Sequence, residues 1–286
     1  MMQEQVNIGE LMLHHTADGY YIEPFGLFKI EWHRLPDLHL GPLTLNLTPT
    51  KHVVFMAIAA ALVFLTMWAA GRSLEKQRAG EKPPRGWANA IEAIVLWVRN
   101  EIAIDNIGHE AGAKFAPYIT ALFFFILYCN LLGLLPGGAT ATGNLAVTAA
   151  LAALALLTIE ISGLVKLGPK GYLRTIFPTM PGMSGAGAVV MSIAMAPIEI
   201  LGKLVKPFAL CFRLFGNMTA GHFVILALLG LIFMFGHLEH WNWAIGIGSA
   251  TLVLGVMALE IIVAFVQAYV FAIITAVLIG MMQHAH

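Results

Sequence analysis

Charge is the scarcest property of this sequence. Only 11% of its 286 residues are charged and 59% are hydrophobic, whereas soluble domains carry about 25% charged residues. Such a chain has too few polar groups to cover a soluble domain, which predicts a polytopic membrane protein. The 16 basic and 16 acidic residues balance to a net charge of zero. This balance argues against nucleic acid as a partner.

Cysteines and chemical motifs are also scarce. The two cysteines, Cys129 and Cys211, lie in apolar stretches and are interpreted as small buried hydrophobes rather than a disulfide. The sequence contains no HExxH, Cys/His ligand spacing, glycine-rich phosphate loop or nucleophile constellation. We therefore expect no metal, no cofactor, no bound nucleotide and no catalytic site of its own. No basic segment followed by an apolar run opens the chain, so no cleavable signal is expected.

The chain divides into an acidic N-terminal part and an apolar remainder. Residues 1–50 are predicted to form an extracytoplasmic segment, and alternating stretches such as LTLNLT are compatible with a hairpin. Residues 51–286 are predicted to form the membrane domain. Its first three spans are expected at about 53–71, 117–135 and 145–165. Residues 87–104 favour an amphipathic helix on the membrane surface.

Two very long apolar segments, at about 189–235 and 241–282, complete the chain. One continuous helix over the first would be about 70 Å long, whereas the hydrocarbon layer is about 30 Å thick. Each segment is therefore either two ordinary spans or one strongly tilted helix. Because no clear turn signal interrupts them, we favour a tilted helical hairpin joined by the polar residues 236–243. The predicted fold is an all-α membrane protein with about five membrane segments and one surface helix.

The basic residues predict the orientation in the membrane. Residues 72–116 contain seven lysines and arginines and residues 166–190 contain three, whereas 136–144 and 236–243 contain none. Positive loops remain in the cytoplasm. We therefore expect the N-terminus outside and the C-terminus in the cytoplasm.

Few ionisable or amide side chains interrupt the two long segments, and such groups are costly within a membrane. Those considered are Glu199, Lys203, Lys206, Arg213, Asn217, His222, Glu260 and Gln267. Arginine keeps its charge even in apolar surroundings. Lys203 and Lys206 have an alternative interpretation, in which their amines simply extend to the membrane interface. The carboxylate that accompanies Arg213 is expected to be Glu260 or to belong to another subunit.

Helical spacing arranges these side chains in lines. Glu199, Lys206 and Arg213 follow one another at seven-residue intervals, so they drift only about 20° per step and share a face. Asn217 comes one turn after Arg213, and His222 lies on the opposite face. Glu260 and Gln267 are again seven residues apart. The pattern predicts an antiparallel hairpin whose polar lines form a water-accessible path beside one fixed cation.

The motif around Arg213 resembles subunit a of F-type ATP synthases. RLFGNMTAGH at 213–222 follows KP at 206–207 and Glu199. NLLGLLPG at 130–137, GNLAVTAAL at 143–151 and the Glu260–Gln267 pair add to the similarity, which covers about residues 45–282.

This resemblance implies a proton-conducting stator in a bacterial inner membrane. Its partners would be the ring of c subunits, the peripheral stalk subunit b and the rest of the complex. By motif position, Arg213 would be the essential residue that faces the ring carboxylates, with Asn217 and Gln267 nearby. His222 and Glu260 would belong to the half-channel open to the outside, and Glu199 would border the cytoplasmic exit.

Some bacterial members have the acid and the imidazole exchanged between positions 222 and 260. This exchange predicts that His222 and Glu260 touch and act as a proton relay. A self-contained channel or secondary transporter is the alternative function. It predicts inverted repeats, and no second copy of RLFGN is present.

Overall fold

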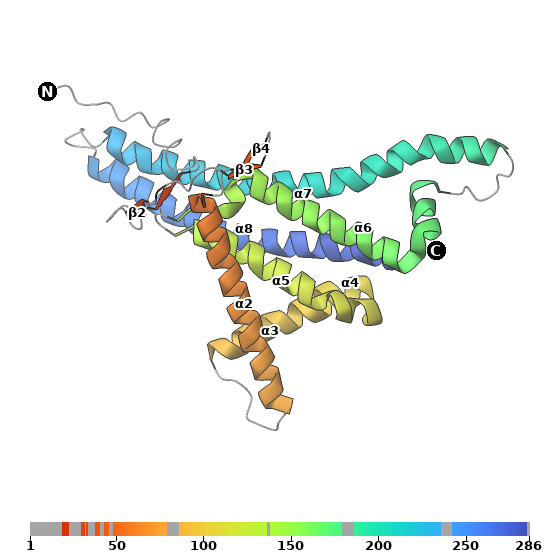
Figure 1. The fold of residues 1–286 in the computed structure, drawn as a ribbon. Helices are drawn as coiled ribbons and strands as arrows, with labels where there is room; N and C mark the ends of the chain where they lie inside the picture. The colour runs from red at the N-terminus through yellow and green to blue at the C-terminus, as the bar shows by residue number, and fades with distance from the viewer. Residues whose placement is uncertain are drawn as a thin grey trace. The chain divides into compact units, whose positions relative to one another are not determined.

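Helices make up most of the described chain (Figure 1). The computed structural model describes residues 19–22, 30–31, 33, 38–40, 43–45, 48–78, 86–135, 138–178, 186–235 and 242–284. The helices are α2 (Lys51–Arg78), α3 (Trp87–Trp97), η2 (Val98–Ile104), α4 (Asp105–Ile107), α5 (His109–Gly133), η3 (Ala141–Gly143), α6 (Leu145–Ile176), α7 (Ala186–Phe235) and α8 (Asn242–His284).

The described residues of the N-terminal segment include four short strands. β1 (Tyr21–Ile22) pairs with β2 (Ile30–Glu31), and β3 (Leu38–Leu40) pairs with β4 (Leu43–Leu45), both antiparallel. The second pair includes the first half of LTLNLT, where the alternation was compatible with a hairpin.

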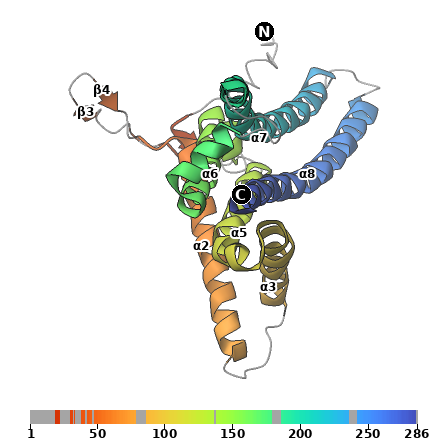
Figure 2. The ribbon, with the colours of Figure 1, turned by 90° about the vertical axis from the view of Figure 1, so that its right-hand side faces the viewer.

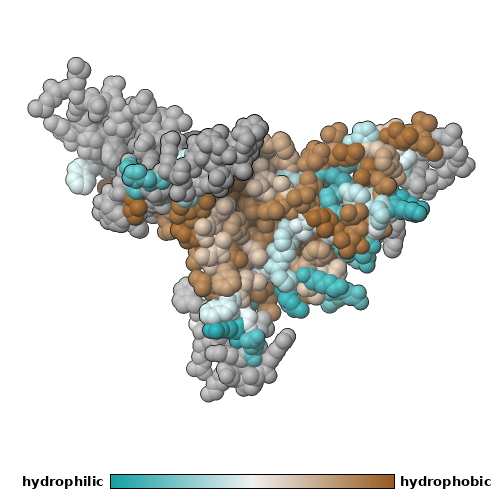
Figure 3. All heavy atoms as spheres, viewed as in Figure 1, coloured by the Kyte–Doolittle hydropathy of each residue, from teal (hydrophilic) through white to brown (hydrophobic). Residues whose placement is uncertain are grey.

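Five of the helices are long and apolar enough to cross a membrane, namely α2, α5, α6, α7 and α8. Large hydrophobic side chains stand on their outer surfaces: Phe64, Val165 and Val190 are 69%, 79% and 67% exposed. Hydrophobic residues cover much of the described surface visible in Figure 3. Because lipid rather than water is the favourable surrounding for such a surface, the chain is a multi-pass membrane protein, and the prediction of five membrane segments is confirmed.

Three helices extend beyond the ranges expected from the sequence. α2 continues to Arg78, past the expected end of its span at 71. α5 begins at His109 and contains Pro117, where the span was expected to start. A membrane helix tolerates an internal proline because neighbouring groups compensate for the lost hydrogen bond. α6 continues to Ile176, through residues interpreted as a loop. It kinks at Gly168 (φ 67°, ψ 171°), a conformation open essentially only to glycine, and Pro169 then begins the second helical segment.

Each of the two long apolar segments is a single helix. α7 contains 50 residues and α8 contains 43, so their lengths are about 75 Å and 65 Å. Pro197 and Pro207 lie inside α7 without ending it. The alternative of two ordinary spans in each segment is therefore wrong. The predicted turn at 236–243 lies mostly outside the described residues.

Contacts divide the chain into two compact units. The first contains Met1–Leu62, Phe125–Asn144 and Leu214–Gln267; the second contains Val63–Phe124, Leu145–Arg213 and Ala268–His286. In the first unit the later part of α7 runs beside the earlier part of α8 (Figures 1 and 2).

In the second unit, the helical stretch at 87–104 packs against other helices. The Trp97 ring stacks on Tyr269 of α8, with 5.5 Å between ring centroids, and meets the edge of Phe123 of α5. Val98 and Ile102 are completely buried. The apolar side of this amphipathic stretch is thus covered by protein.

Candidate functional site

The first unit joins α7 to α8 through two amides. Asn217 Nδ2 donates a hydrogen bond of 3.0 Å to Gln267 Oε1. Gln267 is buried, whereas Asn217 remains exposed on the surface of α7. The structure therefore brings together two of the predicted site residues, one from each long helix. Because Asn217 is exposed, its amide is accessible to a partner that packs against α7.

A buried carboxyl group lies about two helical turns before Gln267 on α8. Glu260 is 8% exposed, and its Oε2 has no hydrogen-bond partner among the described residues. Its side chain lies against Gly221 of α7: a Cβ atom at residue 221 would overlap Oε1 and would stand only 2.8 Å from Cδ. Only a glycine at this position leaves room for the carboxyl group between the helices.

His222 contacts a threonine. Its Nε2 is hydrogen-bonded to Thr140 Oγ1, and within the described part of the chain no hydrogen bond joins it to Glu260. The backbone oxygen of Thr140 accepts a hydrogen bond of 3.0 Å from His52 Nδ1, on α2. The two members of the predicted relay therefore occupy neighbouring positions, because Glu260 lies against Gly221, but His222 has a different direct partner.

Asn130 of α5 holds the segment that carries Thr140. The Thr142 hydroxyl donates to Asn130 Oδ1 at 2.8 Å, and Asn130 Nδ2 donates to the Ala264 carbonyl of α8 at 3.4 Å. Asn130 and Thr142 are completely buried. This network ties the connection between α5 and α6 to α8.

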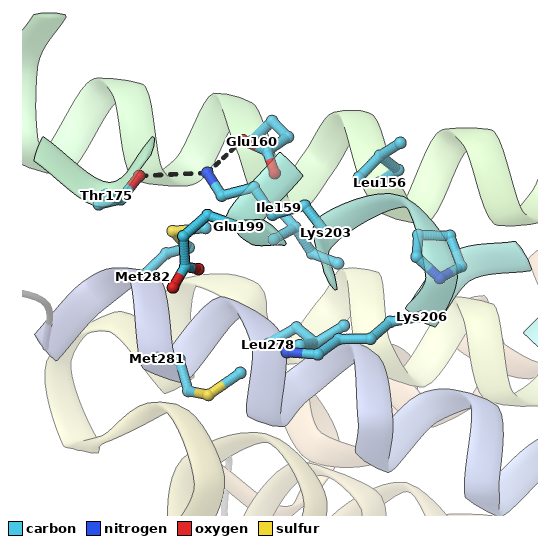
Figure 4. Close-up of a pocket in the computed structure, with 11 residues that line it drawn as sticks. Leu156, Ile159, Glu160, Thr175, Glu199, Lys203, Lys206, Leu278, Met281 and Met282 are labelled. Atoms are coloured by element: carbon cyan, nitrogen blue, oxygen red, sulfur yellow. Dashed lines mark hydrogen bonds and ion pairs between the residues drawn. The ribbon is translucent and has the colours of Figure 1, made fainter. Parts of the chain in front are cut away.

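The second unit contains a pocket of about 240 Å³ whose charged lining comes from α6 and α7 (Figure 4). Glu199, Lys203 and Lys206 line it from α7, and Glu160 from α6. Pro207 and apolar side chains from α6 and α8 complete it: Leu156, Ile159, Leu278, Met281 and Met282. A charged pocket of this kind, lined by membrane helices, is suited to hold water or ions.

Lys203 is anchored inside this pocket. Its amine lies 3.3 Å from Glu160 Oε2, donates to Thr175 Oγ1 at 3.1 Å and stands over the Tyr172 ring. Figure 4 shows the amine directed towards Glu160 and Thr175. The kink at Gly168 makes this possible, since it brings Thr175 to the pocket and Tyr172 to Glu160 and Lys203. Lys203 is thus paired within the pocket wall, whereas Lys206 is exposed.

Arg213 is an exposed residue of α7, within the second unit. Phe208 and Phe212, also on α7, are 65% and 47% exposed, so the charge stands among apolar side chains. Glu260 belongs to the first unit, and the expectation that Glu260 or a carboxylate of another subunit accompanies Arg213 stays a prediction. No three His, Cys, Asp or Glu residues of the described chain gather as a metal site would require. The histidines of the HLEH stretch, His237 and His240, lie outside the described residues.

Sequence reasoning missed His52, Thr140 and Asn130 in the first unit, and Glu160 with Tyr172 in the second. Asn130 could have been found, because a buried amide in an apolar span needs partners. Thr140 and His52 gave no such signal. Each lies at the end of a helix, and the two come into contact only in the folded chain.

These features define a class: a multi-pass membrane protein with hydrogen-bonded and ionisable side chains between long, lipid-compatible helices. The family model described as "ATP synthase A chain" matches residues 53–280. The chain belongs to this family.

Curated relatives agree along nearly the whole chain. "ATP synthase subunit a" of Anaeromyxobacter dehalogenans (strain 2CP-C) is 42% identical over 284 residues, covering 96% of this chain and 70% of the relative. The protein of that name from Chloroherpeton thalassium is 42% identical, with 94% and 75% covered. The one from Myxococcus xanthus is 43% identical, with 88% and 78% covered.

Proposed function

We propose that this chain is the proton-translocating stator subunit of an F-type ATP synthase, with Arg213 facing the carboxylates of a rotating ring of c subunits. The observation that carries the proposal is the exposure of Arg213 among exposed phenylalanines on a membrane helix. A permanent cation on an apolar surface is stabilised when a partner brings an opposite charge to it. Gly216 and Ala220 are also exposed on α7, and such small residues allow another helix to approach closely.

Arg213 then controls the charge of each passing carboxyl group. Burying a bare carboxylate in apolar surroundings costs several kcal/mol, so ring carboxyl groups facing lipid stay protonated. Beside Arg213 the ionised form is stabilised, and the proton leaves through one half-channel. After the ring has turned past Arg213, the carboxylate takes up a proton from the other half-channel. The fixed cation also prevents protons from passing directly between the two.

The half-channel open to the outside runs through the polar groups of the first unit. Glu260 is buried with an unpaired oxygen among the described residues, which suits a group that takes up and releases protons. His222 adds an imidazole, whose two ring nitrogens can donate and accept hydrogen bonds. Asn217 and Gln267, joined at 3.0 Å, line the path towards the ring with neutral hydrogen-bonding groups.

The cytoplasmic half-channel runs through the pocket of the second unit. Glu199 and Lys206 line this pocket of about 240 Å³, and both precede Arg213 on α7 at seven-residue spacing. Lys203 is held by Glu160, so its charge is balanced within the wall. Glu199 is the carboxylate that accepts the departing proton.

The orientation, the location and the partners of the chain are part of the same proposal. The N-terminus lies outside and the C-terminus in the cytoplasm of a bacterial inner membrane, as the distribution of basic residues predicts. The chain has no catalytic site of its own. It works with the c ring, the peripheral stalk subunit b and the rest of the complex, where ATP is made. Each proton crossing about 150 mV supplies about 3.5 kcal/mol.

The test replaces Arg213 with alanine in the intact complex and measures ATP-driven proton pumping into membrane vesicles. Arg174→Ala is the matched control, because Arg174 is an exposed arginine of α6 that does not line the pocket. We expect Arg213→Ala to assemble and to pump no protons, and Arg174→Ala to pump normally. Normal pumping by assembled Arg213→Ala complexes would refute the proposed role.

A further inference from the structure

A buried threonine stands between two histidines at the connection from α5 to α6. Thr140 is 5% exposed and His52 is 6% exposed. The Thr140 hydroxyl is hydrogen-bonded to His222 Nε2, and its backbone oxygen accepts from His52 Nδ1 at 3.0 Å. The two contacts use different groups of the same residue, and these groups have different chemistry.

The contact with His52 fixes the backbone. A carbonyl oxygen only accepts hydrogen bonds, so His52 Nδ1 has to carry the hydrogen in this contact. The contact with His222 is of another kind, because a hydroxyl group both donates and accepts. It can release its hydrogen to one neighbour while its oxygen takes a proton from another, and it stays neutral throughout.

The surroundings hold this hydroxyl in place. A Cβ atom on Gly133 would overlap Thr140 Oγ1 and would lie 2.7 Å from its Cβ, so α5 approaches Thr140 closely only because residue 133 is glycine. The bond from Thr142 to Asn130 fixes the same segment from its other side at 2.8 Å. The Thr140 side chain is packed against Gly133, and its backbone segment is fixed by the Thr142–Asn130 bond. It therefore presents its hydroxyl to His222 in one geometry.

We propose that the Thr140 hydroxyl is a proton-transferring group of the half-channel open to the outside and exchanges protons with His222 Nε2. In each transfer a hydrated proton of the outer compartment is delivered to the Thr140 oxygen and leaves neutral water behind, while the Thr140 O–H bond breaks and its hydrogen passes to the unprotonated Nε2 of His222. One proton moves and Thr140 is restored. This inference rests on the proposed function, and it adds a group that is neither acid nor base to the path.

The first experiment removes the hydroxyl and keeps the shape. Passive proton conductance, driven by an imposed potential, is measured in vesicles that carry the whole complex after its catalytic head has been stripped. Thr140→Val should lower the conductance about tenfold or more, since a positioned proton-transferring side chain contributes at least that much. Thr140→Ser should stay within about twofold of wild type, because it keeps the hydroxyl. Thr140→Ala replaces the valine variant if that complex does not assemble.

The second experiment moves the hydroxyl without changing it. Gly133→Ala introduces a Cβ that overlaps Thr140, whereas Gly143→Ala introduces one at 3.6 Å from the Thr140 Cβ, an ordinary contact. We expect Gly133→Ala to lower proton conductance and Gly143→Ala to leave it unchanged. ATP hydrolysis by the membranes before stripping reports assembly of each variant.

The outcomes separate this inference from the function on which it rests. If assembled complexes lacking the Thr140 hydroxyl conduct protons like wild type, the inference is wrong while the proposed function stands. Equal conductance of Gly133→Ala and Gly143→Ala would overturn it in the same way. If wild-type vesicles conduct no protons under the imposed potential, the proposed function itself fails.

Discussion

Gly221 is the residue whose enlargement should most directly disturb Glu260. Replacing it with alanine places a methyl group on Glu260 Oε1 and 2.8 Å from its Cδ. Because the helix backbone cannot give way easily, the carboxyl group has to move. The change adds one carbon to a membrane helix and alters no charge, so its effect reports the position of that carboxyl group.

The magnitude follows from the overlap. The overlap falls on the far end of the flexible Glu260 side chain, so the carboxyl group moves aside and the effect comes from its changed position. Moving a proton-transferring group by about 1 Å alone can slow a reaction about 100-fold. We therefore expect the proton conductance of Gly221→Ala complexes to fall by about one to two orders of magnitude.

The assay is passive proton conductance of head-stripped vesicles, with Gly71→Ala as the control. Gly71 also lies in a membrane-compatible helix, α2, and a Cβ there meets nothing within 4 Å. The control should conduct like wild type. Wild-type conductance in assembled Gly221→Ala complexes would show that the position of the Glu260 carboxyl group does not govern proton flow.

Two further predictions concern pairs of residues. In a double-mutant cycle with Asn217→Ala and Gln267→Ala, proton conductance should show a coupling of about 0.5–1.5 kcal/mol, the usual worth of one hydrogen bond; strictly additive losses would mean that the 3.0 Å bond is not part of the working path. Lys203→Met should lower the unfolding temperature of the purified complex, because it leaves Glu160 without its ion pair. Adding Glu160→Leu should recover most of that loss, and a further decrease in the double variant would contradict the pairing.

The sequence was sufficient to predict the membrane helices but not all of their ends. Five apolar segments of the right length predict five spans, and α7 and α8 match the expected ranges closely. The first span was expected to end at 71 although α2 continues to Arg78, and the other errors arose at prolines. Pro117 was taken as the start of a helix although α5 begins at His109, and the segment after Gly168 was taken as a loop although Pro169 begins a second helical segment. Proline is compatible with both situations, and neighbouring helices decide between them.

The candidate site was predictable where helical spacing decides it. Asn217 and Gln267 could be placed on polar lines from their positions, and they meet in the structure. The partners of His222 and Lys203 could not be predicted, because Thr140 and Glu160 lie 82 and 43 residues away in sequence. Contacts of that range depend on how the connections fold back, and side chains such as threonine give no periodic signal.

The most direct test of the central claim is to measure ATP synthesis and passive proton conductance together in Arg213→Ala and Glu260→Gln complexes. If Arg213 separates two half-channels, Arg213→Ala should lose ATP synthesis, yet head-stripped vesicles should still conduct protons because the remaining path is intact. Glu260→Gln should lose both, since a group that carries protons has been removed. ATP synthesis at the wild-type rate in assembled Arg213→Ala complexes would contradict the account.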